Sequence, residues 1–320
     1  MTPPELERKY TSQAVSSYRF VNPDWRDSAS YRDLGLSSRN FAIRVHHEIL
    51  QADYVIGVGQ TIPHMIAGFG GGGKIIIPGC ADHDTIGAIH WLSHEVPEGQ
   101  LFAVRDNSVR SVIDEAAQKA GLKFILNEVP GGDRLAGVFA GDPILAHRQA
   151  CACALKVFQV PIPQKADIVI SDAYTADLDF WQALKGLNAA CTAVKDHGIV
   201  ILVAPCHEGA SSQHAQLTGI GYIPCPEIIR LVADKQLDQA VAGNLYLGRQ
   251  LLDRAHVILV TKGIPREDTE AMGFDWAANP EIALKKAFAR CGPSACIAVL
   301  YKAAKMICQA PVAMLPPVAK

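Results

Sequence analysis

Residues 61–91 read TIPHMIAGFGGGGKIIIPGCADHDTIGAIHW and concentrate the unusual chemistry of the chain. Within them, four consecutive glycines, Gly70–Gly73, lead into Lys74. A glycine run is entropically costly to order, so it indicates a backbone conformation that side chains forbid or the close approach of a large group. His64 precedes the run, and His90 follows it on an expected helix. Together these residues predict a cofactor or metal site.

A phosphate loop is a weaker interpretation of the same glycines. Residues 68–74 fit the pattern G-x-x-x-x-G-K, whose backbone N–H groups hold phosphates. Such a loop must run directly into a helix whose N-terminus binds the anion. Here the lysine is followed by β-branched Ile75–Ile77 and then by Pro78, which is typical of a short strand. An enzyme that binds a nucleotide phosphate is therefore only a minor alternative.

Two further pairs have chemically useful spacing. His90 and His94 are four residues apart, so both imidazoles could reach one metal, although an ordinary helix-face histidine is favoured for His94. Gln182 and Lys185 lie one turn apart on another expected helix, which suits a substrate carboxylate. A solvated lysine on an amphipathic helix is the commoner explanation of that pair. Apolar neighbours of Lys74 would desolvate its amine and lower its pKa, which favours nucleophilic use.

Alternating strand and helix patterns predict an α/β fold. We expect mostly parallel sheets with helices on both faces, and a Rossmann-like C-terminal half. The prolines at 161 and 163 predict a boundary between an N-terminal cofactor and catalytic domain, residues 1–160, and a C-terminal α/β domain, residues 161–320. Helices are expected at 38–52, 82–92, 108–120, 144–157, 178–194, 226–233 and 280–289. Strands are expected at 54–59, 75–77, 101–104, 123–129, 134–139, 166–171, 198–204, 256–261 and 295–301.

The bulk composition narrows the class of protein. A formal charge of −2 gives no electrostatic case for nucleic acid or an anionic membrane surface. Apolar runs are strand-sized, far below the roughly 20 residues that span a bilayer, and the polar start has no signal-peptide core. We therefore expect a cytoplasmic protein with no membrane and no nucleic-acid partner. The nine scattered cysteines are expected to be buried free thiols.

The central stretch resembles the nickel-dependent lactate racemase (LarA) family. The family signature runs approximately PH-x-x-AGF-x-GG-x-K-x-I-x-PG, followed by a helix with a histidine. Here PHMIAGFGGGGK, residues 63–74, is followed by Pro78-Gly79 and His90 in register. Similarity continues in GVFAGDPILAHR, in ADIVISDAYTADLDFWQALKGLNAA and in ILVAPCHEG, so the resemblance covers nearly the whole chain.

This resemblance implies a racemase or epimerase of a lactate-like 2-hydroxy acid. Its cofactor would be a nickel-pincer nucleotide, a pyridinium mononucleotide with sulfur ligands for nickel, joined through a thioamide to Lys74 and lying against Gly70, Gly71, Gly72 and Gly73. His90 would bind nickel, a metal that imidazole suits. His64 would be an acid/base residue, and Gln182 and Lys185 would contact the substrate carboxylate. Proteins that make the cofactor would be partners.

The implied reaction is proton-coupled hydride transfer in two reversible steps. A histidine takes the hydroxyl proton while the α-hydride moves to the pyridinium ring, which leaves a planar 2-oxo acid. Hydride return to the opposite face inverts the centre, with a second histidine handling the proton.

The chain also departs from the family pattern. In the family, the segment resembling MTPPELERKY follows a T-H-R-P motif that carries the second acid/base histidine, and a D-x-T-R element lies further upstream. We therefore expect either that the start at Met1 is shortened or misassigned, or that half of the catalytic pair is lost. A truncated, non-catalytic homologue that binds the cofactor or a carboxylate is the main alternative. Trp181 in place of a usual tyrosine, and Asp172-Ala173 in place of Gly-Gly, leave the identity of the hydroxy acid open.

Overall fold

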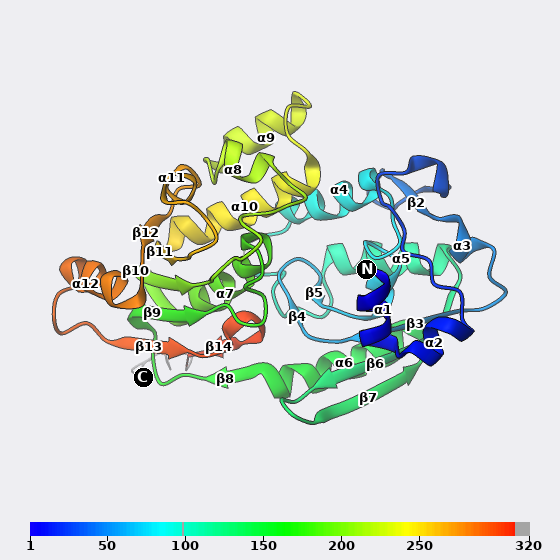
Figure 1. Cartoon of the computed structure of the whole chain (residues 1–320), viewed down its shortest axis with the longest axis horizontal. Helices are drawn as coiled ribbons and strands as arrows, with labels where there is room; N and C mark the ends of the chain where they lie inside the picture. Colours follow the sequence, from blue (N-terminus) through cyan, green and yellow to red (C-terminus); the bar gives the residue numbers. More distant parts are fainter. Residues whose placement is uncertain (98, 311–320) are drawn as a thin grey trace, which may run out of the picture.

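The structure is a computed structural model that describes residues 1–97 and 99–310 of the chain. A three-stranded sheet in the N-terminal half joins β3 (Val55–Gln60), β6 (Leu122–Pro130) and β7 (Leu135–Gly141). A five-stranded sheet in the C-terminal half has the order β12 (Asp275–Ala277), β11 (His256–Val260), β10 (Val194–Val203), β9 (Ala166–Asp172) and β13 (Ile297–Leu300). Figure 1 shows the two sheets on opposite sides of the molecule.

Two helices cover one face of the three-stranded sheet. In this sheet β6 pairs in parallel with β3 and antiparallel with β7. Helices α5 (Ser108–Lys119) and α6 (Pro143–Phe158) bury the inward side chains of β6, among them Ile125 and Val129. The outward residues Ile56, Val58 and Leu126 are exposed. This sheet therefore has one packed and one open face.

The remaining elements of the N-terminal half are short or lie between the sheets. They are α1 (Pro3–Tyr10), α2 (Ser12–Ser17), η1 (Ser28–Ser30), β1 (Tyr31–Leu36), β2 (Ala42–His46), α3 (His47–Leu50), β4 (Pro63–His64), β5 (Gly68–Phe69), η2 (Gly72–Ile75), α4 (His83–Trp91), η3 (Leu92–Glu95) and β8 (Gln159–Pro161). Helix α4 begins as the sequence predicts, because the N-cap Asp82 side chain accepts the Thr85 N–H at 2.9 Å.

The five-stranded sheet is parallel throughout and packed on both faces. Helices α7 (Phe180–Ala193) and α10 (Gln239–Arg254) bury one set of side chains, which includes Val200 and Leu202. Helix α12 (Pro280–Cys291) buries the alternate set, which includes Ile199 and Ile201. Alternate residues of one strand thus enter different cores, because neighbouring side chains point to opposite faces. The other elements are α8 (Gln216–Ile220), α9 (Cys225–Ala233), α11 (Arg266–Ala271), η4 (Ala303–Lys305) and β14 (Ile307–Gln309).

The α/β class with mostly parallel sheets is confirmed, but several local predictions are wrong. Residues 42–46 form a strand that pairs antiparallel with β1, so the helix expected at 38–52 is reduced to the single turn of α3. The strand expected at 75–77 is instead a 3-10 turn followed by buried loop, and 101–104 is also loop. Helix α10 was not predicted from the sequence. The domain boundary near residue 161 stays a prediction.

No helix in the described ranges combines the length and the apolar character needed to cross a membrane.

Candidate active site

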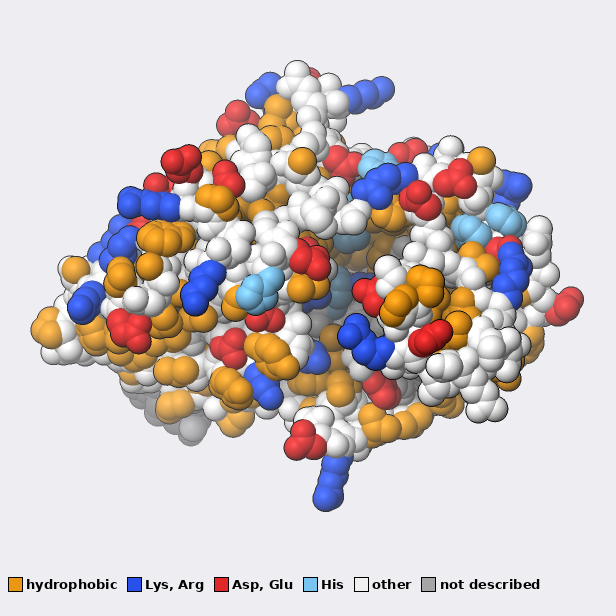
Figure 2. Space-filling view, viewed as in Figure 1, with side chains coloured by type: hydrophobic (Ala, Val, Ile, Leu, Met, Phe, Trp, Pro, Cys, Tyr) orange, Lys and Arg blue, Asp and Glu red, His pale blue; other side chains and the backbone are white. Residues whose placement is uncertain are grey.

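A cavity of about 330 Å³ lies where the two halves meet. Figure 2 shows the surface hollowed between the halves, with histidine side chains at the depth of the hollow. The N-terminal half contributes His64, Lys74 and His90, and α7 contributes Gln182 and Lys185. The structure therefore brings together five chemically active side chains that were predicted from the sequence. The rest of the lining is Met65, Ile66, Trp181, Leu184, Asn244 and Leu247.

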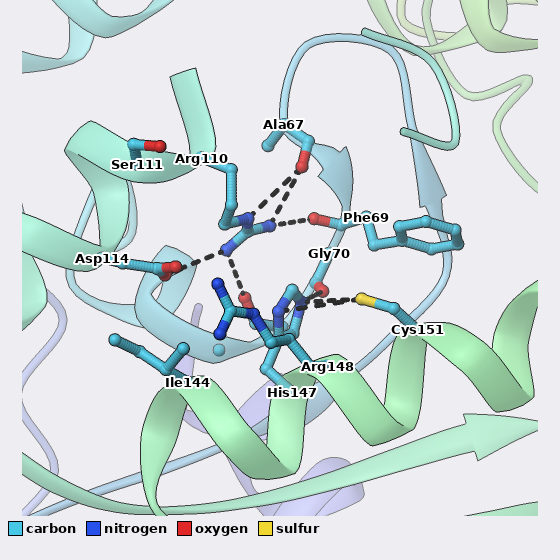
Figure 3. Close-up of polar contacts among 12 residues, drawn as sticks. Ala67, Phe69, Gly70, Arg110, Ser111, Asp114, Ile144, His147, Arg148 and Cys151 are labelled. Atoms are coloured by element: carbon cyan, nitrogen blue, oxygen red, sulfur yellow. Dashed lines mark hydrogen bonds and ion pairs between the residues drawn. The ribbon is translucent and has the colours of Figure 1, made fainter. Parts of the chain in front are cut away.

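The loop that carries Lys74 is held through its backbone carbonyls (Figure 3). Arg110, a buried residue of α5, donates to Ala67 O at 3.2 and 3.3 Å, to Gly71 O at 3.2 Å, and also to Phe69 O. Asp114, one turn along the same helix, lies 3.8 Å from the guanidinium. One buried cation thus supplies a donor to the Phe69 carbonyl and a second donor to the Ala67 and Gly71 carbonyls, which also accept the backbone N–H groups of Phe69 and Lys74.

Two more buried side chains complete this support. His147 of α6 donates from Nε2 to Gly70 O at 2.8 Å, and Asn127 of β6 accepts the Gly72 N–H at 2.7 Å. Burial lowers the pKa of His147 to about 3, so its ring is neutral at pH 7. The loop is therefore fixed from α5, α6 and β6, elements that are distant from it in sequence.

Close packing explains three of the four glycines. A Cβ on Gly71, whose φ is +75°, would lie 2.6 Å from Asn127 Oδ1. A Cβ on Gly72, whose φ is +59°, would lie 2.8 Å from the His147 ring, and one on Gly73 would lie 2.9 Å from Ala117 Cβ. Real side chains do not tolerate such approaches, so these positions require glycine. The expectation that Gly70–Gly73 also contact a cofactor stays a prediction.

His64 and Lys74 form a hydrogen-bonded pair whose direction can be derived. The backbone N–H groups of Ile66 and Ala67 both donate to His64 Nδ1 at 3.2 Å, so that atom carries no hydrogen. A neutral imidazole then has its hydrogen on Nε2, which lies 2.7 Å from Lys74 Nζ. The lysine must accept this hydrogen with its lone pair. The geometry therefore describes a neutral amine.

Electrostatics favour the same protonation states. Burial, with the nearby charges of Arg110 and Lys185, lowers the pKa of Lys74 to about 7. Burial lowers the pKa of His64 well below its usual value, and the Lys74 and Lys185 charges add to this effect. A cationic imidazole would also place an N–H against two backbone N–H groups. The His64 ring is thus most stable uncharged, and the Lys74 amine is mainly uncharged above about pH 7.

In His90 the ring nitrogen without a hydrogen is Nε2, whereas in His64 it is Nδ1. Its Nδ1–H donates to Ile86 O at 2.7 Å, which is the i−4 carbonyl of its own helix. Nε2 therefore carries a lone pair, and His90 lines the cavity. Burial lowers the pKa of His90 to about 4, which keeps this lone pair available at pH 7. Donation of the second ring N–H to a carbonyl is the usual arrangement of a metal-binding histidine.

His94 does not join His90, in agreement with the ordinary interpretation of its spacing. Its ring stacks on Trp91 at 4.0 Å between centroids, and its Nδ1–H donates to Trp91 O at 2.7 Å. In the described part of the chain, no group of three or more histidine, cysteine, aspartate or glutamate side chains could hold a metal ion.

Gln182 and Lys185 form the opposite wall of the cavity. Helix α7 is capped by Asp179, whose side chain accepts the Gln182 N–H at 2.8 Å, and this cap fixes where the pair begins. Lys185 Nζ donates to Gln182 Oε1 at 2.5 Å. Burial, opposed in part by Asp179, lowers the pKa of Lys185. The pair offers a cationic donor and an amide to an anionic group in the cavity.

Four residues that support the loop or line the cavity were not predicted from the sequence: Arg110, Asn127, His147 and Asn244. Only Arg110 left a usable signal, because it is a charged residue among Val109, Val112 and Ile113 on the apolar face of a predicted helix. The other three are ordinary residue types whose positions depend on tertiary packing.

The chain is similar to known proteins over most of its length. Residues 1–100 match the model of the lactate racemase N-terminal domain, and residues 162–308 match the lactate racemase C-terminal domain. A lactate racemase of Thermoanaerobacterium thermosaccharolyticum is 31% identical over 209 residues, which are 64% of this chain and 49% of that protein. A lactate racemase of Lactiplantibacillus plantarum is 29% identical over 312 residues, which are 92% of this chain and 71% of that protein. The match thus spans about half the length of the first relative.

Solved structures have the same fold. The lactate racemase apoprotein from Thermoanaerobacterium thermosaccharolyticum superposes with a TM-score of 0.86 at 26% identity, over 97% of this chain and 75% of that chain. A Thermotoga maritima protein gives 0.79 at 20% identity, over 97% and 83% of the two chains, which shows a shared fold alone.

Proposed function

The chain belongs to the lactate racemase family, and from this membership we propose that it is an isomerase that inverts the C2 centre of a 2-hydroxy acid with a nickel-pincer nucleotide held on Lys74. The observation that carries the proposal is the single cavity that joins Lys74, His64 and His90 to Gln182 and Lys185.

The residues present fit the proposed cofactor. Acylation of a lysine requires a neutral amine, and Lys74 accepts a hydrogen bond from His64 with its lone pair. A nickel ion requires a lone pair on imidazole, and His90 Nε2 provides one. In this proposal His90 is the ligand from the protein, and the sulfur atoms of the nucleotide supply other ligands. When bound, the nucleotide supplies a pyridinium ring that can accept and return a hydride.

The chain's own residues would bind and orient the substrate. The substrate carboxylate would lie against Lys185 Nζ and the Gln182 amide, which replaces part of their mutual hydrogen bond with a charge-assisted one. The apolar side chains Met65, Ile66 and Leu184 exclude water from the same space. This arrangement fixes one end of the acid and directs C2 toward the side of the cavity that carries Lys74 and His90.

His64 would move the proton of the substrate hydroxyl. To act as a base, it must present Nε2 without a hydrogen. That hydrogen must first move to Nδ1, and the ring must turn away from the N–H groups of Ile66 and Ala67. The low pKa of His64 keeps the ring neutral at pH 7, which is the form that a base needs.

Mass spectrometry and a chiral assay together test the proposal. The chain, co-produced with cofactor-making proteins, should carry an adduct on the Lys74 peptide and about one nickel per chain, and should convert one enantiomer of a 2-hydroxy acid into the other. Lys74→Arg should carry no adduct. Absence of both adduct and nickel from the unsubstituted chain would refute the proposal. Adduct and nickel without any turnover would indicate a binding protein instead.

A further inference from the structure

Asn244 lies in the wall of the catalytic cavity and is not used by the chemistry above. It is 8% exposed and belongs to α10. The preceding residue, Gly243, packs against the helix of His90, because a Cβ there would lie 2.7 Å from His90 O. Asn244 therefore follows a residue that packs against the helix of His90, and it shares the cavity wall with Gln182 and Lys185.

A buried tyrosine fixes the orientation of the Asn244 amide. Tyr222 is 3% exposed, and its hydroxyl donates to Asn244 Oδ1 at 2.9 Å. Burial raises the pKa of Tyr222, so the phenol stays protonated and remains the donor. With Oδ1 engaged, the amide turns its NH₂ group away from Tyr222. Among residues 1–97 and 99–310, the NH₂ group of Asn244 makes no hydrogen bond.

The NH₂ group of Asn244 is open to the cavity, where water can bond it. A ligand that displaces this water without supplying an acceptor would leave the donor unsatisfied, so the position of the amide indicates an oxygen on the ligand. Met65, Leu184 and Leu247, which line the same cavity, are apolar and give no acceptor. The carboxylate of a 2-hydroxy acid is already bound by Gln182 and Lys185 in the proposed function. The methyl group of lactate offers Asn244 nothing to bind.

We infer that Asn244 binds a second oxygen of the substrate, and that the substrate is a 2-hydroxy acid with a further hydroxyl group on its carbon chain. This inference rests on the proposed function, since it assumes that a hydroxy acid occupies the cavity. Asn244 would determine specificity, and Tyr222 would position it.

Two isosteric pairs of acids test the inference, because in each pair one acid has a hydroxyl group where the other has a methyl group. Glycerate is compared with 2-hydroxybutyrate, and 2,4-dihydroxybutyrate with 2-hydroxypentanoate. The cofactor-loaded chain should favour the oxygenated acid by at least about 10-fold in kcat/KM in one of the pairs, since a site built to bind a hydroxyl discriminates against the analogue without it. Asn244→Leu, which keeps the size and removes the donor, should bring this ratio close to one.

Two further variants separate the specific effect from a structural one. Asn188→Leu makes the same change on α7, at a residue that lines a neighbouring cavity, and it should leave the ratio as it is in the unsubstituted chain. Tyr222→Phe removes the hydrogen bond that orients the amide. It should lower the kcat/KM ratio of the oxygenated acid to its isostere, to a value between that of the unsubstituted chain and that of Asn244→Leu. The inference is overturned if neither pair shows a preference, or if Asn244→Leu preserves it.

Two more measurements separate binding of the substrate by Asn244 from binding of the nucleotide, and binding from turnover. If Asn244→Leu reduces the yield of the Lys74 adduct but leaves the ratio unchanged, the amide serves the nucleotide and the inference is wrong. Dissociation constants of the same four acids, from ligand-observed NMR, give the preference without turnover. A chain that discriminates in binding through Asn244 but racemises nothing would refute the proposed function and leave the assignment of Asn244 supported.

Discussion

Burial and the charges of Arg110 and Lys185 lower the pKa of Lys74 to about 7, and the hydrogen bond from His64 favours the same uncharged amine. Two backbone N–H groups force the imidazole hydrogen onto Nε2, and this hydrogen stabilises the uncharged amine. The effect on stability follows from the direction of the shift. A lysine has a pKa near 10.4 in an unfolded chain and Lys74 has about 7 in the folded one. The unfolded state therefore binds more protons between these values, and this residue makes the fold more stable as the pH rises from about 7 to 10.

Lys74 should react with a small acylating reagent in a pH-dependent manner. We expect the modification rate of the unloaded chain to rise with a midpoint near pH 7, because only the neutral amine is a nucleophile. Peptide mass spectrometry over pH 5–10 measures this midpoint. In His64→Leu, which lacks the donor, the midpoint should move to higher pH. A midpoint near 10 in the unsubstituted chain would contradict the derived protonation state.

Arg110 should contribute more to stability than any exposed arginine. Arg110→Met removes the side-chain donor from the carbonyls of Ala67, Phe69 and Gly71 and leaves Asp114 without its partner, which should cost about 3 kcal/mol of the free energy of unfolding. Arg105→Met, at an exposed ion pair with Asp106, should change it by less than about 1 kcal/mol. Urea unfolding compares the two variants. Equal effects would show that the buried guanidinium does not support the loop.

Among the elements, the glycine-rich loop depends on contact with helices that follow it in sequence. The run at 70–73 could be recognised as unusual from the sequence, but not why it is needed. Its turns place Ile76 and Ile77 in the core formed with α5, which explains why a segment with strand propensity becomes a loop. Tertiary burial of these two residues overrides their local preference.

The contact between the loop and α5 can be tested by one methyl group. Gly73→Ala places a Cβ 2.9 Å from Ala117 Cβ and 3.0 Å from Ile113 O, so it should reduce the free energy of unfolding by about 1–3 kcal/mol. Gly219→Ala, where nothing lies within 4 Å of the added atom, is the matched control and should be neutral or slightly stabilising. Thermal denaturation measures both. Equal midpoints would mean that the loop can move away from α5 at no cost.

Local signals predicted the helices with clear N-caps at 82, 107, 142 and 179, but they missed α10 and placed a helix at 38–52 where most residues do not form one. Asp82, Asn107, Asp142 and Asp179 each cap the helix that follows, and these caps can be read from neighbouring residues. The strand at 42–46 depends on its partner β1, and the position of Asn127 depends on β3 and the loop. No local pattern carries such information. The site residues Lys74, His64 and His90 were predicted by resemblance, and the structure places them together.

At the scale of the whole molecule, the two halves also meet beside the cavity through aromatic and polar contacts. Trp25 stacks on His83 at 5.2 Å between centroids and lies 6.3 Å from His214, which in turn stacks on Trp181 of the cavity wall. Arg26 donates to Gln213 at 2.7 Å. These contacts connect the N-terminal segment to the C-terminal half next to Trp181 of the cavity wall.

Loss of Trp25 should open this side of the cavity. In Trp25→Ala, we expect Lys74 to react faster with a bulky amine reagent such as trinitrobenzenesulfonate, while its rate with a small reagent changes little. Tyr18→Ala, at an exposed aromatic residue of the same segment, should leave both rates unchanged. The ratio of the two rates is the measurement. An unaltered ratio in Trp25→Ala would show that this contact does not restrict entry.

In the proposed function, the hydrogen bond between His64 and Lys74 would also decide whether attachment at Lys74 or proton transfer by His64 comes first. Once a lysine nitrogen is acylated, its lone pair is shared with the adjoining carbon, and it is no longer an effective acceptor. Attachment at Lys74 would therefore take away the partner that His64 Nε2–H has in the unloaded chain. In the proposed function, His64 would therefore stay bonded to Lys74 in the unloaded chain, and it would become free to move a proton only after the cofactor has been attached.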